Sequence, residues 1–161
     1  EGFSSLVGKF DQLIQSKTLR LRVMHNDTKV NNILLDKTTG DVVCVIDLDT
    51  LMPGYFIYDL GDMIRTFVSP VAEDESDLSK VSVRTEIKDA IEWTYIEGLR
   101  DVLTADEVKA KDFAGPMMTY IMALRFLTDF LNNDQYYHTA YPNHNLVRAQ
   151  NQLRLLELLL A

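Results

Sequence analysis

Two short polar stretches carry the residues whose types and spacing could do chemistry. In the first, Asp27 precedes Asn32 by five positions, and in the second, Asp47 follows the apolar run 42–46. A carboxylate can accept the proton of a hydroxyl group, and carboxylate and amide oxygens are ligands that Mg²⁺ prefers. Transfer of a nucleotide's γ-phosphoryl group needs both, because the acceptor must be aimed in line and the triphosphate charge must be neutralised. The two stretches therefore predict a phosphoryl-transfer site.

Each polar residue of these stretches has a predicted role. Asp27 is the predicted catalytic base, and Lys29 would offset negative charge on the phosphoryl group in flight. Asn32 and Asp47 are the predicted magnesium ligands. Asp49 would add a ligand or orient one. Single Asp and Asn residues in loops are usually turn or cap residues, so it is the joint spacing that favours a site.

His25 and Asp59 also have structural interpretations. His25 could move a proton in the catalytic loop. We favour a packed imidazole, hydrogen-bonded to the backbone, that holds the loop in shape, because Asp27 already supplies the base. Asp59 is predicted both to cap a helix that starts at Tyr58 and to support the catalytic loop.

The predicted strands would bring the two polar stretches together. Residues 19–24 alternate apolar and basic side chains, as a short strand would, and lead to the loop at His25. Residues 33–35 and 42–46 read as the two strands of a hairpin, in which Gly40 takes the positive φ that a tight turn needs. Because this hairpin connects the two stretches, we expect the base and the metal ligands to face a common space.

The rest of the chain has a helical pattern. Apolar spacing and the caps Ser82, Thr104 and Asn145 predict helices at about 3–14, 58–68, 83–103, 105–110, 116–131 and 145–160. Residues 69–82 contain Pro70 and several acids and are predicted to form a mobile surface loop. The larger apolar side chains Trp93, Met117, Met118 and Met122 are predicted to belong to the core. The predicted fold is mostly α with a small β-hairpin.

Composition narrows the class of protein. The chain has 161 residues and is 47% apolar, which predicts a single globular domain over 1–161. The formal net charge is -8 and the basic residues are scattered, which argues against nucleic-acid binding. Cys44 is the only cysteine, so no disulfide can form within the chain, which fits a cytoplasmic protein. No apolar run approaches the roughly 18 residues of a membrane span, so we expect no membrane association.

Substrate residues are predicted from the chemistry of sugar sites. Such sites combine aromatic faces with a few directed polar groups. Arg125, Tyr136 and Tyr137 offer a charge on an apolar helix and two aromatic rings just past its end, and Thr50 lies beside the metal acids. The alternative is that Arg125 pairs with Asp129, four residues further along the helix, and that the tyrosines only pack.

The two stretches together resemble a known superfamily. His25, Asp27 and Asn32 in the pattern HxDxxxxN, Asp47 in IDxD and Asp59 in YDLGD are similar to the C-terminal lobe of the aminoglycoside phosphotransferase and choline kinase superfamily, distant relatives of the protein kinases. The resemblance implies the C-terminal lobe of a protein-kinase-like fold that uses ATP and Mg²⁺. It implies the same base, Asp27, and the same metal ligands, Asn32 and Asp47.

Within the superfamily, residues 25–32, 45–54 and 124–137 look most similar to the N-acetylhexosamine 1-kinases, which phosphorylate the anomeric hydroxyl of an amino sugar. One departure is Asn26, where many relatives carry Gly; Asn also visits left-handed backbone conformations. The other is that nothing before His25 resembles a Gly-rich nucleotide loop or a phosphate-contacting Lys. The resemblance thus implies that the nucleotide-binding N-terminal lobe lies outside this chain, which would be inactive without it.

Two other functions compete with the kinase. A glycosyltransferase could use Asp47 and Asp49 as a DxD pair that holds a metal and a nucleotide sugar, but this leaves His25, Asp27 and Asn32 without a task. A non-catalytic interaction module derived from a kinase is the third possibility, and the presence of every expected acid argues against it.

Overall fold

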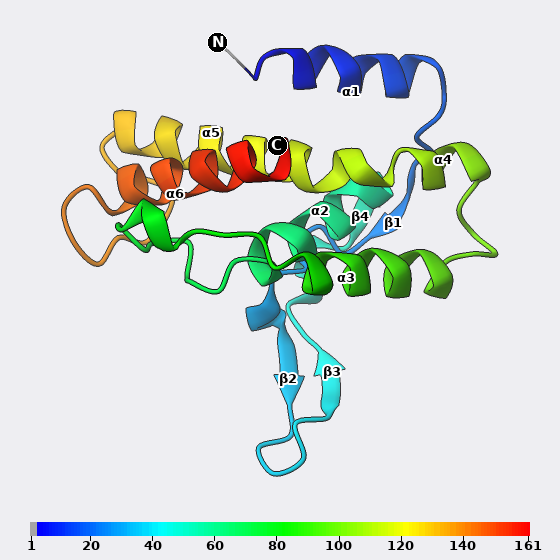
Figure 1. Ribbon diagram of the computed structural model, residues 1–161, viewed down its shortest axis with the longest axis horizontal. Helices are drawn as coiled ribbons and strands as arrows, with labels where there is room; N and C mark the ends of the chain where they lie inside the picture. Colours follow the sequence, from blue (N-terminus) through cyan, green and yellow to red (C-terminus); the bar gives the residue numbers. More distant parts are fainter. Residues whose placement is uncertain (1–2) are drawn as a thin grey trace.

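The computed structural model describes residues 3–161 and confirms a mostly α fold with a small β component (Figure 1). The α-helices are α1 (Ser5–Gln15), α2 (Phe56–Phe67), α3 (Thr85–Gly98), α4 (Ala105–Lys109), α5 (Ala114–Leu131) and α6 (His144–Leu159). Short 3₁₀ turns occur at Val30–Asn32 (η1), Leu48–Thr50 (η2), Leu78–Lys80 (η3) and Lys111–Phe113 (η4). The strands are β1 (Arg22–Met24), β2 (Ile33–Leu35), β3 (Val42–Val45) and β4 (Met52–Gly54).

Helix α5 lies at the centre of the helical part. It packs against both α2 and α6, and Figure 1 shows α5 and α6 side by side and antiparallel. Its sequence is apolar on almost every face, as expected of a helix enclosed by two others. Pro116 falls in its first turn, where the missing N–H costs no helical hydrogen bond. The core is completed by side chains such as Phe56, Leu60 and Leu155, all without solvent exposure.

Two glycines let α2 and α5 approach closely. A Cβ on Gly61 would collide with the backbone carbonyl oxygen of Ala114 and would lie 2.6 Å from the Met118 Cγ. A Cβ on Gly115 would lie 2.8 Å from the Ile64 Cγ2. The pair therefore sets the separation between the helix that follows the metal acids and the central helix.

The β structure consists of two small antiparallel pairs. Strands β2 and β3 form the predicted hairpin, with Ile33 opposite Val45 and with Gly40 at a φ of 77°. The second pair, β1 with β4, was not predicted, because β4 is only three residues long and contains Pro53. This second pair places the strand before the catalytic loop beside the strand after the metal acids.

The β2–β3 hairpin projects from the helical part, as Figure 1 shows. Its apolar side chains are largely exposed, including those of Leu35, Val42 and Val43, and Cys44 is exposed as well.

Several predicted helix ends were wrong. Helix α3 begins after Arg84 instead of after Ser82 and ends at Gly98. Helix α6 is preceded by Asn143 in a left-handed conformation, so Asn145 is not a cap but a buried residue of the first turn. The predicted cap Thr104 is confirmed, with a full capping box to Glu107.

The core prediction held for the methionines and failed for Trp93. Met117, Met118 and Met122 are buried, whereas the Trp93 side chain is 71% exposed on α3. Helical spacing alone does not say which face of α3 meets the core, because apolar side chains such as Ile91, Tyr95 and Ile96 occur on more than one side of the helix. No helix within 3–161 has both the length and the apolarity needed to cross a membrane.

The segment 69–82 is irregular apart from η3, as a loop prediction requires, but it is tied to α6. The Asn151 amide donates hydrogen bonds to the carbonyl oxygens of Ala72 and Glu75, and the His144 Nε2 lies 3.3 Å from the Asp74 Oδ2.

Candidate active site

The catalytic loop is held by the carboxylate of Asp59, which points from the first turn of α2. The backbone N–H groups of His25 and Asn26 donate to its two oxygens at 2.9 and 2.7 Å. Asp59 is not the helix cap that we predicted, because α2 begins at Phe56 and its N-cap is Tyr55. Burial raises the pKa of Asp59 although these two N–H groups favour the charged form.

Asn26 occupies the left-handed conformation anticipated at this position, with a φ of 63°. Its side-chain amide donates to the carbonyl oxygens of Met24 and Thr50 at 3.1 Å and of Met52 at 3.3 Å. The side chain fits because residue 54 is Gly, where a Cβ would lie 2.6 Å from the Asn26 Oδ1. Asn26 thus fastens the catalytic loop to the strand pair below it.

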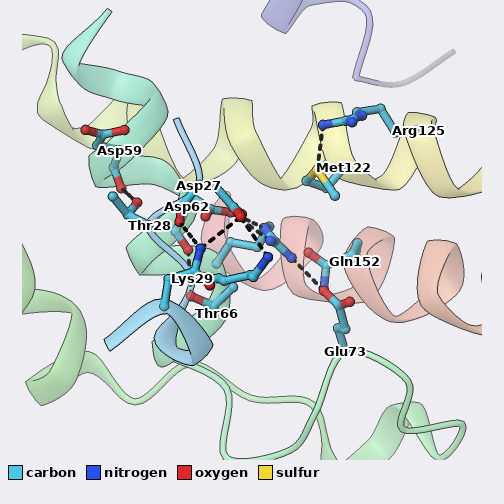
Figure 2. A network of polar contacts seen from close by, with 12 residues as sticks. Asp27, Thr28, Lys29, Asp59, Asp62, Thr66, Glu73, Met122, Arg125 and Gln152 are labelled. Atoms are coloured by element: carbon cyan, nitrogen blue, oxygen red, sulfur yellow. Dashed lines mark hydrogen bonds and ion pairs between the residues drawn. The ribbon is translucent and has the colours of Figure 1, made fainter. Parts of the chain in front are cut away.

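Four of the predicted site residues lie close together where this loop meets the hairpin, and Figure 2 shows two of them, Asp27 and Lys29. The Asp27 Oδ2 accepts from the Lys29 Nζ at 2.7 Å and from the Asn32 Nδ2 at 2.9 Å. The Lys29 Nζ also lies 4.0 Å from the Asp47 Oδ2. The hairpin therefore brings Asp27, Lys29, Asn32 and Asp47 into one cluster.

Lys29 is the positive centre of the cluster. Its partial burial by itself would lower the pKa, but the hydrogen bond to Asp27 and the charges of Asp27, Asp47 and Asp62 outweigh it, so the pKa of Lys29 is raised. The ammonium group is therefore charged at neutral pH and can balance negative charge on a phosphoryl group.

The oxygen atoms of the cluster determine whether it can bind Mg²⁺. Within the part of the chain that is described, no three His, Cys, Asp or Glu side chains are grouped for a metal ion. The donors here are instead the Asp47 carboxylate and the Asn32 amide, whose Nδ2 is turned to Asp27, so that its oxygen faces another way. Two protein oxygens, completed by phosphate oxygens and water, fit the way Mg²⁺ is usually bound beside a nucleotide.

Three predicted residues lie at the edge of the cluster. The His25 Nε2 lies 3.0 Å from the carbonyl oxygen of Ile46 and must donate to it, which turns the ring toward the hairpin. Asp49 is exposed and has no hydrogen bond or ion pair with any residue of 3–161. The Thr50 hydroxyl donates to the His25 carbonyl oxygen at 2.6 Å, so it braces the loop.

A cavity of about 640 Å³ opens beside the cluster. Asp27 and Lys29 line it at one side, and Arg125, Tyr136 and Tyr137 line it as well. Asn32, Asp47 and Asp49 do not; they lie toward the hairpin. The structure thus brings the predicted base and these three predicted substrate residues to the same cavity, although 98 to 110 positions separate them in the sequence.

The segment that carries the two tyrosines is fixed by Asp129. Its carboxylate accepts from the backbone N–H groups of Gln135, Tyr136 and Tyr137 at 3.0, 2.8 and 2.9 Å. Burial opposes the charged form, but these donors outweigh it and lower the pKa of Asp129. The alternative pairing of Arg125 with Asp129 is therefore wrong: the Arg125 guanidinium lies over the rings of Tyr136 and Tyr137 instead, at 5.7 and 5.5 Å.

Sequence reasoning missed a second polar group that lines the cavity, formed by Asp62, Arg65 and Glu73. Arg65 donates to the Asp62 Oδ1 at 2.9 and 2.7 Å and to the Glu73 Oε2 at 2.8 Å. Burial raises the pKa of Asp62, with the charge of Arg65 acting in the opposite direction. The i, i+3 spacing of Asp62 and Arg65 could have indicated the first contact, but Glu73 joins only through the tertiary fold.

The family comparison covers the part of the chain that builds this cluster. Residues 5–79 match the phosphotransferase enzyme family. The match includes the loop that begins at His25, the hairpin and α2. It ends before α5 and α6 and before the segment between them, which carries Tyr136 and Tyr137. The family supports a phosphotransferase of the kinase type in general.

Proposed function

We propose that the chain contributes the catalytic base, the metal ligands and the acceptor cavity of an ATP-dependent small-molecule kinase. The observation that carries the proposal is the position of Asp27. Its carboxylate lines the cavity and is held by Lys29 and Asn32, and Lys29 in turn lies 4.0 Å from Asp47. A base, a fixed positive charge and oxygen ligands in one place are what phosphoryl transfer requires.

In the proposed reaction, an acceptor hydroxyl in the cavity donates a hydrogen bond to Asp27. As the hydroxyl oxygen bonds to the γ-phosphorus of ATP, the bond from that phosphorus to the bridging oxygen breaks and ADP leaves. Asp27 takes the hydroxyl proton, and Lys29 balances charge on the transferred group. Mg²⁺, held by Asn32 and Asp47, would supply charge neutralisation of the triphosphate.

We further propose a sugar as the acceptor, as the resemblance to the N-acetylhexosamine 1-kinases implies, with phosphorylation at C1. A cavity with aromatic rings and a few polar groups supports a sugar-sized ligand. The nucleotide-covering N-terminal lobe stays a prediction.

The test is nucleotide-dependent phosphorylation of N-acetylglucosamine by the full-length protein. Asp27→Asn should lower kcat by about 10²- to 10⁴-fold, because an amide cannot take the proton although it can still accept hydrogen bonds from Lys29 and Asn32. Asp11→Asn, an equal charge change on the exposed face of α1, should have no effect. If Asp27→Asn consumed ATP and formed sugar phosphate at a near-normal rate, Asp27 would not be the catalytic base.

A further inference from the structure

Resting on the proposed function, we infer that the cavity selects an uncharged polyhydroxylated acceptor over a cationic one, and that Gln152 is the residue that recognises its hydroxyl hydrogens. The inference comes from three independent features of the cavity wall: its charges, its aromatic rings and its buried polar atoms.

The charges of the wall leave nothing for a cation. Four basic side chains line the cavity, namely Lys29, Arg65, Arg125 and Arg148, against the three acids Asp27, Asp62 and Glu73. Each of the acids already has a basic partner, Asp27 in Lys29 and the other two in Arg65, although Arg65 donates only to the Oδ1 of Asp62. A cationic acceptor would therefore add positive charge to a wall that already carries an excess of it, and it would have to displace an internal ion pair.

The aromatic rings of the cavity wall already face positively charged groups of the protein itself. The rings of Tyr136 and Tyr137 face the guanidinium of Arg125, and the ring of Phe126 faces that of Arg148 at 5.5 Å. A quaternary ammonium ligand needs the open faces of such rings. Here the faces are taken by arginines, which can themselves donate hydrogen bonds to the oxygens of a neutral ligand.

Buried polar atoms show what a ligand must supply. Gln152 lines the cavity, is 1% exposed, and its Oε1 accepts no hydrogen bond from any residue of 3–161. Its Nε2 donates to the Asn151 Oδ1 at 3.3 Å, so the amide oxygen is the atom of this side chain that lacks a partner among the described residues. A buried acceptor without a donor is unfavourable, and a hydroxyl group removes that cost by donating to it.

Two other cavity atoms have the same property. The Asp62 Oδ2 and the Tyr137 hydroxyl are buried and lack hydrogen-bond partners within the described chain. Both Arg65 donors to Asp62 go to the other oxygen, Oδ1. Figure 2 shows Asp62 near Asp27, whose charge acts on it, and Gln152 lines the same cavity. A ligand with several hydroxyl groups can satisfy these atoms, whereas a quaternary ammonium group has no N–H and cannot donate to them.

The experiment measures ligand binding by NMR chemical-shift titration of the full-length protein without nucleotide, using N-acetylglucosamine, glucose and choline. The expected result is saturable shifts of cavity residues with the two sugars and none with choline. Gln152→Met, which keeps the length of the side chain and removes its acceptor, should weaken sugar binding by about tenfold. Gln150→Met makes the same change two residues earlier in α6, at an exposed position. This variant should bind the sugars as tightly as wild type does.

Tyr137→Phe guards against a folding artefact, because it keeps the ring contact with Phe126 at 4.9 Å and removes only the hydroxyl. It should weaken sugar binding severalfold with an unchanged Tm. Choline shifting the cavity residues at least as strongly as the sugars would overturn the inference, and so would sugar affinities unchanged in both Gln152→Met and Tyr137→Phe.

Failure of the proposed function looks different. If the sugars bind as described but full-length protein with ATP and Mg²⁺ forms no sugar phosphate, the kinase proposal fails while the recognition of a neutral polyol by Gln152 stands. If sugar phosphate forms with the same kcat/KM in Gln152→Met as in wild type, the inference fails and the kinase proposal stands.

Discussion

At the residue scale, the site depends on two non-glycine residues in the left-handed conformation. Asn26 has a φ of 63° and Asp47 a φ of 64°. Asn and Asp are the non-glycine residues that adopt this conformation at the lowest cost. In both cases the side chain also makes contacts that glycine could not make: the Asn26 amide hydrogen-bonds to the backbone, and the Asp47 carboxylate lies 4.0 Å from the Lys29 Nζ.

Asn26 separates these two contributions experimentally. Asn26→Gly keeps the backbone conformation and removes the amide contacts with Met24, Thr50 and Met52, so the free energy of unfolding should fall by about 1 to 2 kcal/mol. Asn26→Ala should cost about 1 kcal/mol more, because Cβ opposes the positive φ without any compensating contact. Urea unfolding of the three proteins measures both steps. An alanine variant as stable as the glycine variant would show that the loop relaxes its backbone.

Asp47 is tested as a metal ligand by Asp47→Asn, since Asn keeps the left-handed backbone and removes the charge. The magnesium-dependent affinity for ATP should fall by about 10- to 100-fold in the full-length protein, which is the typical loss of metal affinity when a residue that surrounds a metal site is mutated. Isothermal titration at several Mg²⁺ concentrations measures this. Asp41→Asn, in the exposed hairpin turn, is the matched control. An unchanged magnesium requirement would exclude Asp47 as a ligand.

At the element scale, α2 connects the catalytic loop to the core. Its first turn supplies Asp59, which holds the backbone of the loop, and its middle supplies Gly61, which lies against the Ala114 carbonyl oxygen of α5. The position of Asp27, the proposed base, therefore depends on how closely α2 can pack on the central helix.

Gly61→Ala should disturb this packing. The added methyl group would meet the backbone of α5, which cannot move aside as a flexible side chain can, so we expect a loss of about 1 to 3 kcal/mol in the free energy of unfolding. Gly8→Ala is the control, since a Cβ there meets no atom within 4 Å and alanine favours helix α1. Both thermal and urea unfolding should show that Gly61→Ala is less stable than wild type and that Gly8→Ala is more stable. Equal stability of Gly61→Ala and wild type would contradict the proposed contact.

At the scale of the whole molecule, Glu107 joins α4 to the strand that leads into the catalytic loop. Its side chain is 0% exposed and accepts from the Arg22 Nη2 at 2.6 Å and from the backbone N–H groups of Thr104 and Arg20. Burial by itself would raise the pKa, but these donors outweigh it, and the pKa of Glu107 is lowered. Because the folded pKa lies below the unfolded one, Glu107 stabilises the protein at neutral pH and loses that effect as the pH falls through the folded pKa.

Glu107→Gln should therefore reduce the free energy of unfolding by about 2 kcal/mol at pH 7, since a charged hydrogen-bond partner of Arg22 is lost. The difference from wild type should begin to shrink below about pH 4, the ordinary range for a glutamate, and should be lost as the pH falls further, through the lowered pKa of the folded protein. Urea unfolding between pH 3 and pH 7 measures the trend. Glu157→Gln, in an exposed pair with Arg154, should change neither value. A pH-independent difference for Glu107→Gln would contradict the linkage.

The sequence by itself determined the local features of the protein. The hairpin from Ile33 to Val45, the turn at Gly40 and the cap at Thr104 follow from propensities of a few adjacent residues, and the structure has all three. The cluster around Asp27 could also be predicted from the sequence, because one short hairpin connects the residues that form it.

Only the tertiary structure decided which distant residues complete the cavity. Gln152, Glu73 and Arg65 come from separate elements, and their meeting depends on how α2, α5 and α6 pack, which no local pattern encodes. The same reason explains the exposure of Trp93 and the pairing of β1 with β4, since burial and strand pairing depend on what the rest of the chain places opposite them.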